Sequence, residues 1–300
     1  MLTRELLSRL RRIEIKTTRL ANEQMAGQYR SVFKGHGINF DEVRPYQEGD
    51  DIRVIDWNVS ARTGELFVKV FAEERELTAF LLLDMSASSK FGSRGRSRQE
   101  LIAEIAAVLA FSAIRNNDRV GLIIFTDKVE HFVPPKKGKT HVLRVIRDIL
   151  SFEPKGRGEA SAGLVEGLKY LTKITKKTSV SFLLSDFFVG EEDVAGVKRA
   201  LSIARQRHDM IPIMTIDPLD ERFPDIGHVA AEDPETGNVI WIDTSSRGVR
   251  RRFEQEAFAQ RARMEAMFKT LSLDYLKVWT DRDDYIPQFN LLFQRRAKRF

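Results

Sequence analysis

Asp84, Ser86 and Ser88 place a carboxylate and two hydroxyls at alternate positions of one short segment. Side chains spaced in this way can converge from a turn onto a single point. Oxygen ligands suit a hard cation, above all Mg²⁺, with Mn²⁺ or Ca²⁺ as alternatives. Asp186 follows a second apolar run and can reach the same ion directly or through water. We therefore predict that Asp84, Ser86, Ser88 and Asp186 form a metal site.

The same segment has a simpler interpretation, in which Asp84 caps the following helix and the serines fill a loop. The second aspartate at a strand end, Asp186, favours the metal site. Because hydroxyl ligands carry no charge, the ion would be only partly neutralised and would attract a carboxylate from another molecule. The pattern thus favours binding of a protein partner, and we predict no catalytic residue.

Two nearly continuous apolar runs, 77–83 and 179–184, predict strands buried on both faces of a sheet, with Asp84 and Asp186 just beyond them. Further strands are predicted at 119–125, 129–133, 210–216 and 239–242, and helices at 97–114, 141–150, 163–174, 191–205 and 253–271. This alternation predicts an α/β fold with a doubly wound, mainly parallel, Rossmann-like sheet. Because Asp217 follows 210–216, all three aspartates are expected at the same sheet edge.

The first part of the chain has a different pattern. Residues 2–20 carry apolar side chains at helical spacing among arginines and lysines, which predicts an amphipathic helix that docks on the domain. Between 31 and 76, glycines and prolines interrupt short β-rich runs, and strands are predicted at 54–61 and 66–71. We expect two domains: residues 1–76, with the helix and a small β-rich appendage, and residues 77–300, with the main α/β fold.

Composition limits the class of protein. The chain has 300 residues, 49 basic and 43 acidic, for a formal net charge of +6. The charges are dispersed and are not interleaved with aromatic residues as stacking platforms require, so we do not expect nucleic-acid binding. Cysteine is absent, which excludes disulfides and thiolate ligands. No apolar run is long enough to cross a bilayer, and a cytoplasmic location is expected.

The motifs resemble a known family. The segment Asp84 to Ser88 is similar to the Asp-x-Ser-x-Ser signature of von Willebrand factor A-type domains, and Leu183-Leu184-Ser185-Asp186 is similar to the strand that carries their later aspartate. The upstream motifs resemble the bacterial family called domain of unknown function 58: Phe40-Asp41-Glu42-Val43-Arg44-Pro45-Tyr46, Gly49-Asp50-Asp51, Ile55-Asp56-Trp57 and Ala61-Arg62-Thr63-Gly64. The resemblance implies a von Willebrand factor A-type fold with a metal-ion-dependent adhesion site.

The resemblance also implies a threonine ligand before the helix 163–174, where this chain has Ala162 with Ser161 one residue earlier. Either Ser161 replaces that ligand, or water does, or the site binds metal weakly or not at all. The family further implies a chaperone-like role in protein maturation or complex assembly, beside a MoxR-type AAA ATPase. The sequence has no Gly-x-x-x-x-Gly-Lys-[Ser/Thr] phosphate loop, so any ATP hydrolysis would belong to the partner.

Two other classes of function remain open. An Mg²⁺-dependent phosphotransferase or hydrolase could use Asp84 as its nucleophile, but such enzymes need an acid two residues later, where this chain has Ser86. A nucleic-acid-binding protein would show strongly salt-dependent binding. Finally, the charged residues between Arg44 and Trp57 form either a partner surface or a local ion-pair network that holds loops together.

Overall fold

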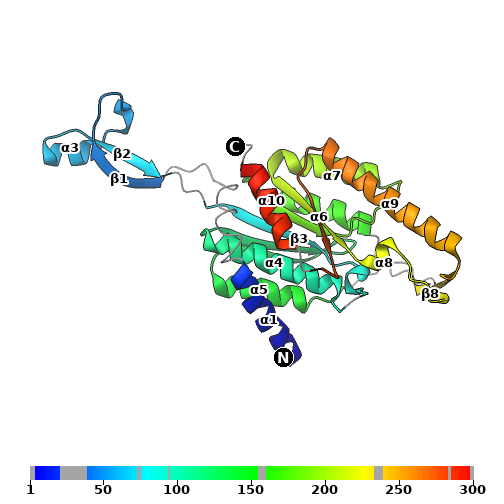
Figure 1. Cartoon of the computed structure of the whole chain (residues 1–300). Helices are drawn as coiled ribbons and strands as arrows, with labels where there is room; N and C mark the ends of the chain where they lie inside the picture. Colours follow the sequence, from blue (N-terminus) through cyan, green and yellow to red (C-terminus); the bar gives the residue numbers. More distant parts are fainter. Residues whose placement is uncertain are drawn as a thin grey trace. The chain divides into compact units, whose positions relative to one another are not determined.

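The computed structural model describes residues 4–20, 39–72, 76–93, 95–154, 160–232, 239–282 and 285–297. The chain forms two compact units, one of residues 33–77 and one of residues 1–32 and 78–300. The N-terminal helix, which we expected in one domain with the appendage, groups with residues 78–300. Helix α1 (Arg4–Leu20) lies against the large unit, where Lys16 pairs with Glu104 at 2.6 Å (Figure 1).

The small unit is an antiparallel pair, β1 (Asn39–Pro45) and β2 (Phe67–Ala72), joined by the short helices η2 (Ile52–Val54) and α3 (Trp57–Thr63). The predicted strand at 66–71 is confirmed within one residue. The predicted strand at 54–61 is wrong, because Asp56 accepts hydrogen bonds from two backbone N–H groups of the first turn of α3 and Gly64 ends the helix in the left-handed conformation. These capping signals outweigh the alternation of apolar residues.

The large unit contains a six-stranded sheet, mainly parallel as predicted, in the order β10-β7-β6-β3-β4-β5. Its parallel strands are β3 (Thr78–Asp84), β4 (Arg119–Phe125), β6 (Val180–Ser185), β7 (Asp209–Ile216) and β10 (Leu276–Trp279), while β5 (Val129–Lys136) pairs antiparallel with β4. Strand β6 is buried throughout and β3 almost throughout. Both faces of the central strands are therefore covered, as their apolar runs predict.

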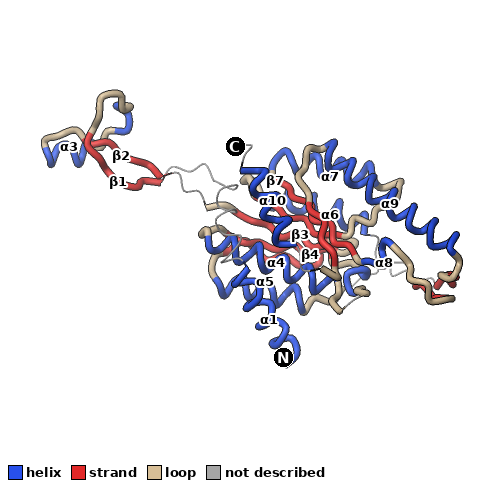
Figure 2. Tube along the Cα trace, viewed as in Figure 1, coloured by secondary structure: helices blue, strands red, loops and turns tan. Residues whose placement is uncertain are grey.

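Two layers of helices enclose the sheet (Figures 1 and 2). One layer includes α4 (Arg98–Arg115) and α5 (Lys139–Leu150), and the other includes α6 (Ala160–Ile174), α7 (Val194–Arg207) and α9 (Arg247–Thr270). Phe80, Leu82 and Leu183 face the second layer in a common core. Strand β10 was not predicted from the sequence; it is only four residues long and extends the sheet beside β7. Helix α10 (Tyr285–Ala297) follows it.

Two smaller elements complete the large unit. The short helix α8 (Pro218–Glu221) follows β7, and β8 (His228–Glu232) pairs with β9 (Val239–Asp243) in a separate antiparallel hairpin. No helix among the described residues is both long enough and apolar enough to cross a membrane.

Candidate metal site at the carboxyl edge of the sheet

Asp84 is the last residue of β3, and its side chain is held in place from two directions. Oδ1 accepts a hydrogen bond from the backbone N–H of Ser86 at 3.1 Å. Oδ2 accepts one from the hydroxyl of Ser185, the last residue of the neighbouring strand β6, at 2.7 Å. Asp84 is only 3% exposed. The parallel pairing of β3 with β6 thus fixes this carboxylate at the sheet edge.

The three other predicted residues adjoin Asp84. The hydroxyls of Ser86 and Ser88 lie 3.1 Å apart. Ser88 in turn donates to Oδ2 of Asp186 at 2.8 Å, and Oδ1 of Asp186 accepts from the backbone N–H of Phe188. Residues almost a hundred positions apart in the sequence are therefore joined in one oxygen-rich group, which we call the Asp84–Asp186 cluster and define as Asp84, Ser86, Ser88 and Asp186.

The loop after β3 does not use these side chains as helix caps. Helix α4 has its own capping box, in which the Ser97 hydroxyl accepts from the Glu100 backbone and the Glu100 carboxylate accepts from the Ser97 backbone. Ser86 precedes the short helix η3 (Ala87–Lys90) but makes no side-chain capping bond. The simpler interpretation of the segment, in which Asp84 caps the following helix, is therefore wrong.

The environment of Asp84 favours its neutral form. Burial, and then the negative charge of Asp186, raise the pKa of Asp84 to about 7, against the opposing effect of the hydrogen bonds from Ser185 and Ser86. A carboxyl that is costly to ionise gains from a nearby cation. Without such a cation, a bound proton neutralises the Asp84 carboxylate up to about pH 7.

Arg98 is a part of the site that sequence reasoning missed. Its guanidinium is 3% exposed and donates from Nη1 to the Ser88 carbonyl at 2.9 Å and to Asp186 at 3.2 Å, and from Nη2 to Asp220 at 2.5 Å. Although burial opposes its charge, Asp186 and Asp220 raise the pKa of Arg98. One signal existed in the sequence: a cation in the first turn of a helix opposes the helix dipole and needs a compensating partner.

Asp217 lies at the same sheet edge, as predicted, but outside the cluster. Its carboxylate accepts hydrogen bonds from the backbone N–H groups of Ser93 and Leu219 and from the hydroxyl of Thr280. Burial acts to raise the pKa of Asp217, but these hydrogen bonds outweigh it and lower the pKa below its usual value. Asp217 therefore ties three loops together at the edge that carries the cluster.

The expected substitute ligand is directed elsewhere. The Ser161 hydroxyl donates to Oδ2 of Asp193 at 2.7 Å, and it joins the start of α6 to the residue before α7. Ala162 is exposed and has no side-chain oxygen. In this arrangement neither residue adds an oxygen to the cluster, so no side chain of 161–162 takes the place that the resemblance assigns to threonine.

Several charged side chains between Arg44 and Trp57 have partners within the small unit. Arg44 and Asp50 form a two-pronged ion pair with both N–O distances at 2.7 Å, and Asp56 caps α3. The hydrogen bond from Arg44 is the largest factor that lowers the pKa of Asp50. Trp57, by contrast, is 67% exposed and remains available for contacts. The ion pair and the helix cap therefore give Arg44, Asp50 and Asp56 a structural role, but they do not explain the exposed indole of Trp57.

The oxygen donors of the cluster are of the kind that a divalent cation prefers, and they would fill only a few of its coordination positions. The cluster offers two carboxylates and two hydroxyls, all oxygen. The described residues contain no group of three or more histidine, aspartate or glutamate side chains arranged to hold a metal. A cation here would therefore keep several water molecules, which is the usual state of Mg²⁺. Such an ion can still exchange a water for an external ligand.

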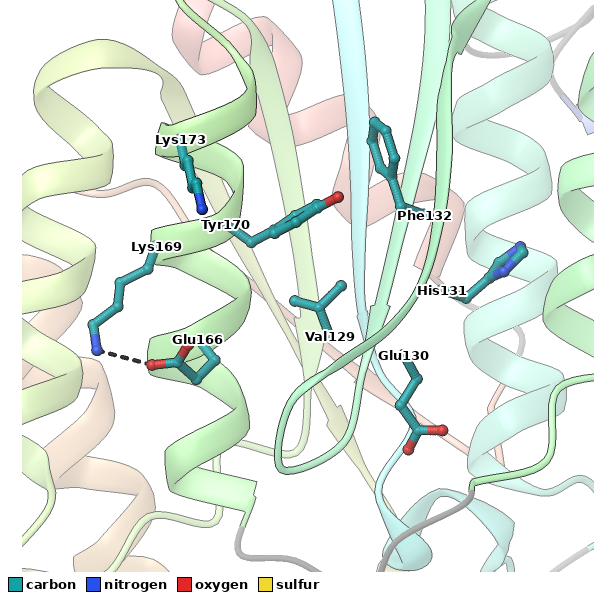
Figure 3. Close-up of a pocket in the computed structure, with 8 residues that line it drawn as sticks. All are labelled: Val129, Glu130, His131, Phe132, Glu166, Lys169, Tyr170 and Lys173. Atoms are coloured by element: carbon teal, nitrogen blue, oxygen red, sulfur yellow. Dashed lines mark hydrogen bonds and ion pairs between the residues drawn. The ribbon is translucent and has the colours of Figure 1, made fainter.

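A cavity of about 540 Å³ elsewhere on the large unit has a different character (Figure 3). It lies between β5 and α6 and is lined by side chains such as Phe132 and Tyr170, whose rings meet edge to face at 5.6 Å. Lys169 pairs with Glu166 along its helical side. None of the cluster residues lines it, so this cavity is no part of the candidate metal site.

The model of the family described as "Protein of unknown function DUF58" matches residues 42–263. The chain belongs to this family. The resemblance seen in its N-terminal motifs is thus confirmed at the family level. The uncharacterized protein Rv1480 of Mycobacterium tuberculosis is 28% identical over 279 residues, which cover 93% of this chain and 86% of that protein. The uncharacterized protein YeaD of Bacillus subtilis is 30% identical over 118 residues, or 39% of this chain and 27% of that protein.

Solved structures give weaker likenesses. The conserved hypothetical protein BatB of Bacteroides thetaiotaomicron aligns with 74% of this chain and 99% of its own, at 16% identity and a TM-score of 0.47. An aerotolerance-related membrane protein of Bacteroides fragilis aligns with 75% of this chain and 100% of its own, at 16% identity and a TM-score of 0.44. Likenesses at this level carry no inference about function.

Proposed function

We propose that this chain is a non-enzymatic protein-interaction module of the von Willebrand factor A type, which uses a metal-ion-dependent adhesion site to bind a partner. The observation that supports this function most directly is the continuity of the Asp84–Asp186 cluster. Two carboxylates from adjacent strand ends and two loop hydroxyls are linked through the Ser86 backbone N–H and the Ser88 hydroxyl at the carboxyl edge of a parallel sheet, where ligands of such sheets bind.

The charge balance of the cluster supports a bridging role for the ion. Asp186 shares its negative charge with Arg98, so Asp84 and Asp186 together supply less than two full charges to a cation. Asp220 binds the same guanidinium and offsets part of the positive charge of Arg98. The rest of that charge acts on Asp186. A bound Mg²⁺ would supply an electrophilic centre for an external carboxylate. Asp84, Ser86, Ser88 and Asp186 would hold the ion, and the partner would supply a further ligand to it.

We propose a MoxR-type AAA ATPase as the partner, with a client protein that is matured or assembled in the cytoplasm. This proposal rests on the family resemblance of the N-terminal motifs. The lack of a phosphate loop in the sequence agrees with a division of labour in which the ATPase hydrolyses ATP and this chain binds protein.

Titration calorimetry with Mg²⁺ and Mn²⁺ tests the first step. The wild-type protein should bind one ion with a measurable heat, and Asp84→Ala and the double variant Ser86→Ala/Ser88→Ala should lose it. Asp127→Asn is the matched control, because Asp127 follows the neighbouring strand β4 outside the cluster and should leave the heat unchanged. Equal traces for wild type and Asp84→Ala would refute the metal site.

The enzyme alternative has less support. Ser86 stands where a general acid would be needed. Hydrolysis of p-nitrophenyl phosphate by the wild-type protein that disappears in Asp84→Asn would overturn our preference for a binding module.

A further inference from the structure

Two exposed phenylalanines line neighbouring surface hollows, one of which also includes Asp186 of the cluster. Phe188 lies two residues after Asp186 and is 68% exposed, whereas its neighbours Phe187 and Val189 are each 1% exposed. Phe258, on α9, is 72% exposed. Isolated exposed apolar residues are common on protein surfaces. Two large rings near a candidate binding site are a different case, because aromatic residues dominate the binding energy of many interfaces.

The surface hollows connect these rings to the cluster. A small hollow of about 50 Å³ is lined by Asp186, Phe188, Ala257 and Arg261, among others. A second hollow, of about 370 Å³, is lined by Phe258 and again by Ala257 and Arg261. The two hollows therefore share one wall on α9. A path over the protein surface leads from the carboxylate of Asp186, past the ring of Phe188, to the ring of Phe258.

The charged groups along this path are largely compensated within the chain. Arg261 pairs with Glu221, and Arg222 pairs with Glu254 at 2.6 Å. An occupant of the second hollow would therefore gain little from its own charge and more from apolar contact with Phe258. Near Asp186 the opposite would hold with the proposed ion bound, because a partly neutralised cation favours an anion. The two ends of the path thus select different chemical groups.

We infer that the partner of this chain presents a carboxylate together with a large apolar side chain, the carboxylate to the ion at the Asp84–Asp186 cluster and the apolar group to the two adjoining hollows that Phe188 and Phe258 line. This inference rests on the proposed metal-dependent function and specifies what that function recognises. The segment recognised is an acidic and apolar stretch of protein that lies along the path from Asp186 to α9.

A display library of random dodecapeptides, selected on the Mg²⁺-loaded full-length protein and eluted with EDTA, supplies the probe. Eluted peptides should carry an aspartate or glutamate and a large apolar residue. Their affinity, measured by fluorescence anisotropy, should fall about tenfold in Phe188→Ser and in Phe258→Ser, while Phe188→Leu keeps most of it. Ile203→Ser is the matched control, since Ile203 is 50% exposed in the last turns of α7, toward the opposite sheet edge.

Calorimetry with Mg²⁺ on the same variants separates the two proposals. Phe188→Ser and Phe258→Ser should bind the ion with the wild-type heat and have wild-type circular dichroism. EDTA-released peptides that bind both serine variants as tightly as wild type would overturn the inference and leave the metal-dependent function intact. Failure to select any EDTA-released peptide on protein that binds Mg²⁺ would also overturn it. Absence of Mg²⁺ binding by the wild-type protein would remove the proposed function and the inference together.

Discussion

The buried carboxyl of Asp84 should make the metal-free protein less stable as the pH rises. Burial and the charge of Asp186 raise the pKa of Asp84 from its ordinary value of 3.8 to about 7 in the folded state. The folded state therefore holds a proton that the unfolded state releases between these two values. Stability from this group is complete below about pH 4, declines as the pH rises, and is lost above about pH 7.

The size of the effect follows from the width of that window. A difference of about three pH units, at about 1.4 kcal/mol each, corresponds to roughly 4 kcal/mol in the free energy of unfolding. Asp84→Asn keeps a neutral side chain at all pH values and should lack this decline. Asp186→Asn removes the neighbouring negative charge, so it should move the decline to lower pH and make it smaller.

Urea denaturation followed by circular dichroism in EDTA, at intervals from pH 4 to pH 8, measures this effect. The quantity to compare is the difference in unfolding free energy between wild type and Asp84→Asn, because contributions of other titrating groups cancel in it. Glu192→Gln, at an exposed carboxylate, is the control and should follow the wild-type curve. A wild-type to Asp84→Asn difference that stays constant over this range would refute our account of the buried carboxyl.

Four further substitutions test the packing and charges of the large unit. Arg98→Met leaves two carboxylates without their buried partner and should lower the unfolding free energy by about 3 to 5 kcal/mol in urea titrations. An unchanged unfolding free energy would contradict the pairing. Gly163→Ala would place a Cβ 1.5 Å from the Thr126 carbonyl oxygen and should lower the melting temperature. Gly196→Ala, in open space within α7, should raise the unfolding free energy by up to about 1 kcal/mol. Equal changes in stability for the two alanine variants would contradict the close packing described at Gly163. Burial, and then the charge of the adjacent arginine, lower the pKa of His208. The stability that this residue contributes should therefore be complete above about pH 6.5 and decrease at lower pH. An equal decrease in the unfolding free energy of His208→Gln at low pH would refute this assignment.

The sequence was sufficient for the parts of the fold that depend on local pattern. The apolar runs before Asp84 and Asp186 correctly predicted buried parallel strands, because a strand covered on both faces needs apolar side chains at nearly every position. The order of strands and helices then predicted that both aspartates lie at one edge of the sheet. The predicted strand at 54–61 failed because Asp56 and Gly64, which start and end α3, were weighed less than the spacing of apolar residues.

The residues that complete the candidate site were beyond local pattern. Arg98 contacts Asp186 and Asp220, which lie 88 and 122 residues further along the chain. Ser161 bonds to Asp193 rather than to the cluster, and nothing in its neighbouring residues indicates this choice. The sequence by itself determined which side chains stand at the strand ends and therefore which oxygens are available. Only the tertiary structure decided which of them share charges and hydrogen bonds, because those partners come together through the packing of the sheet and its helices.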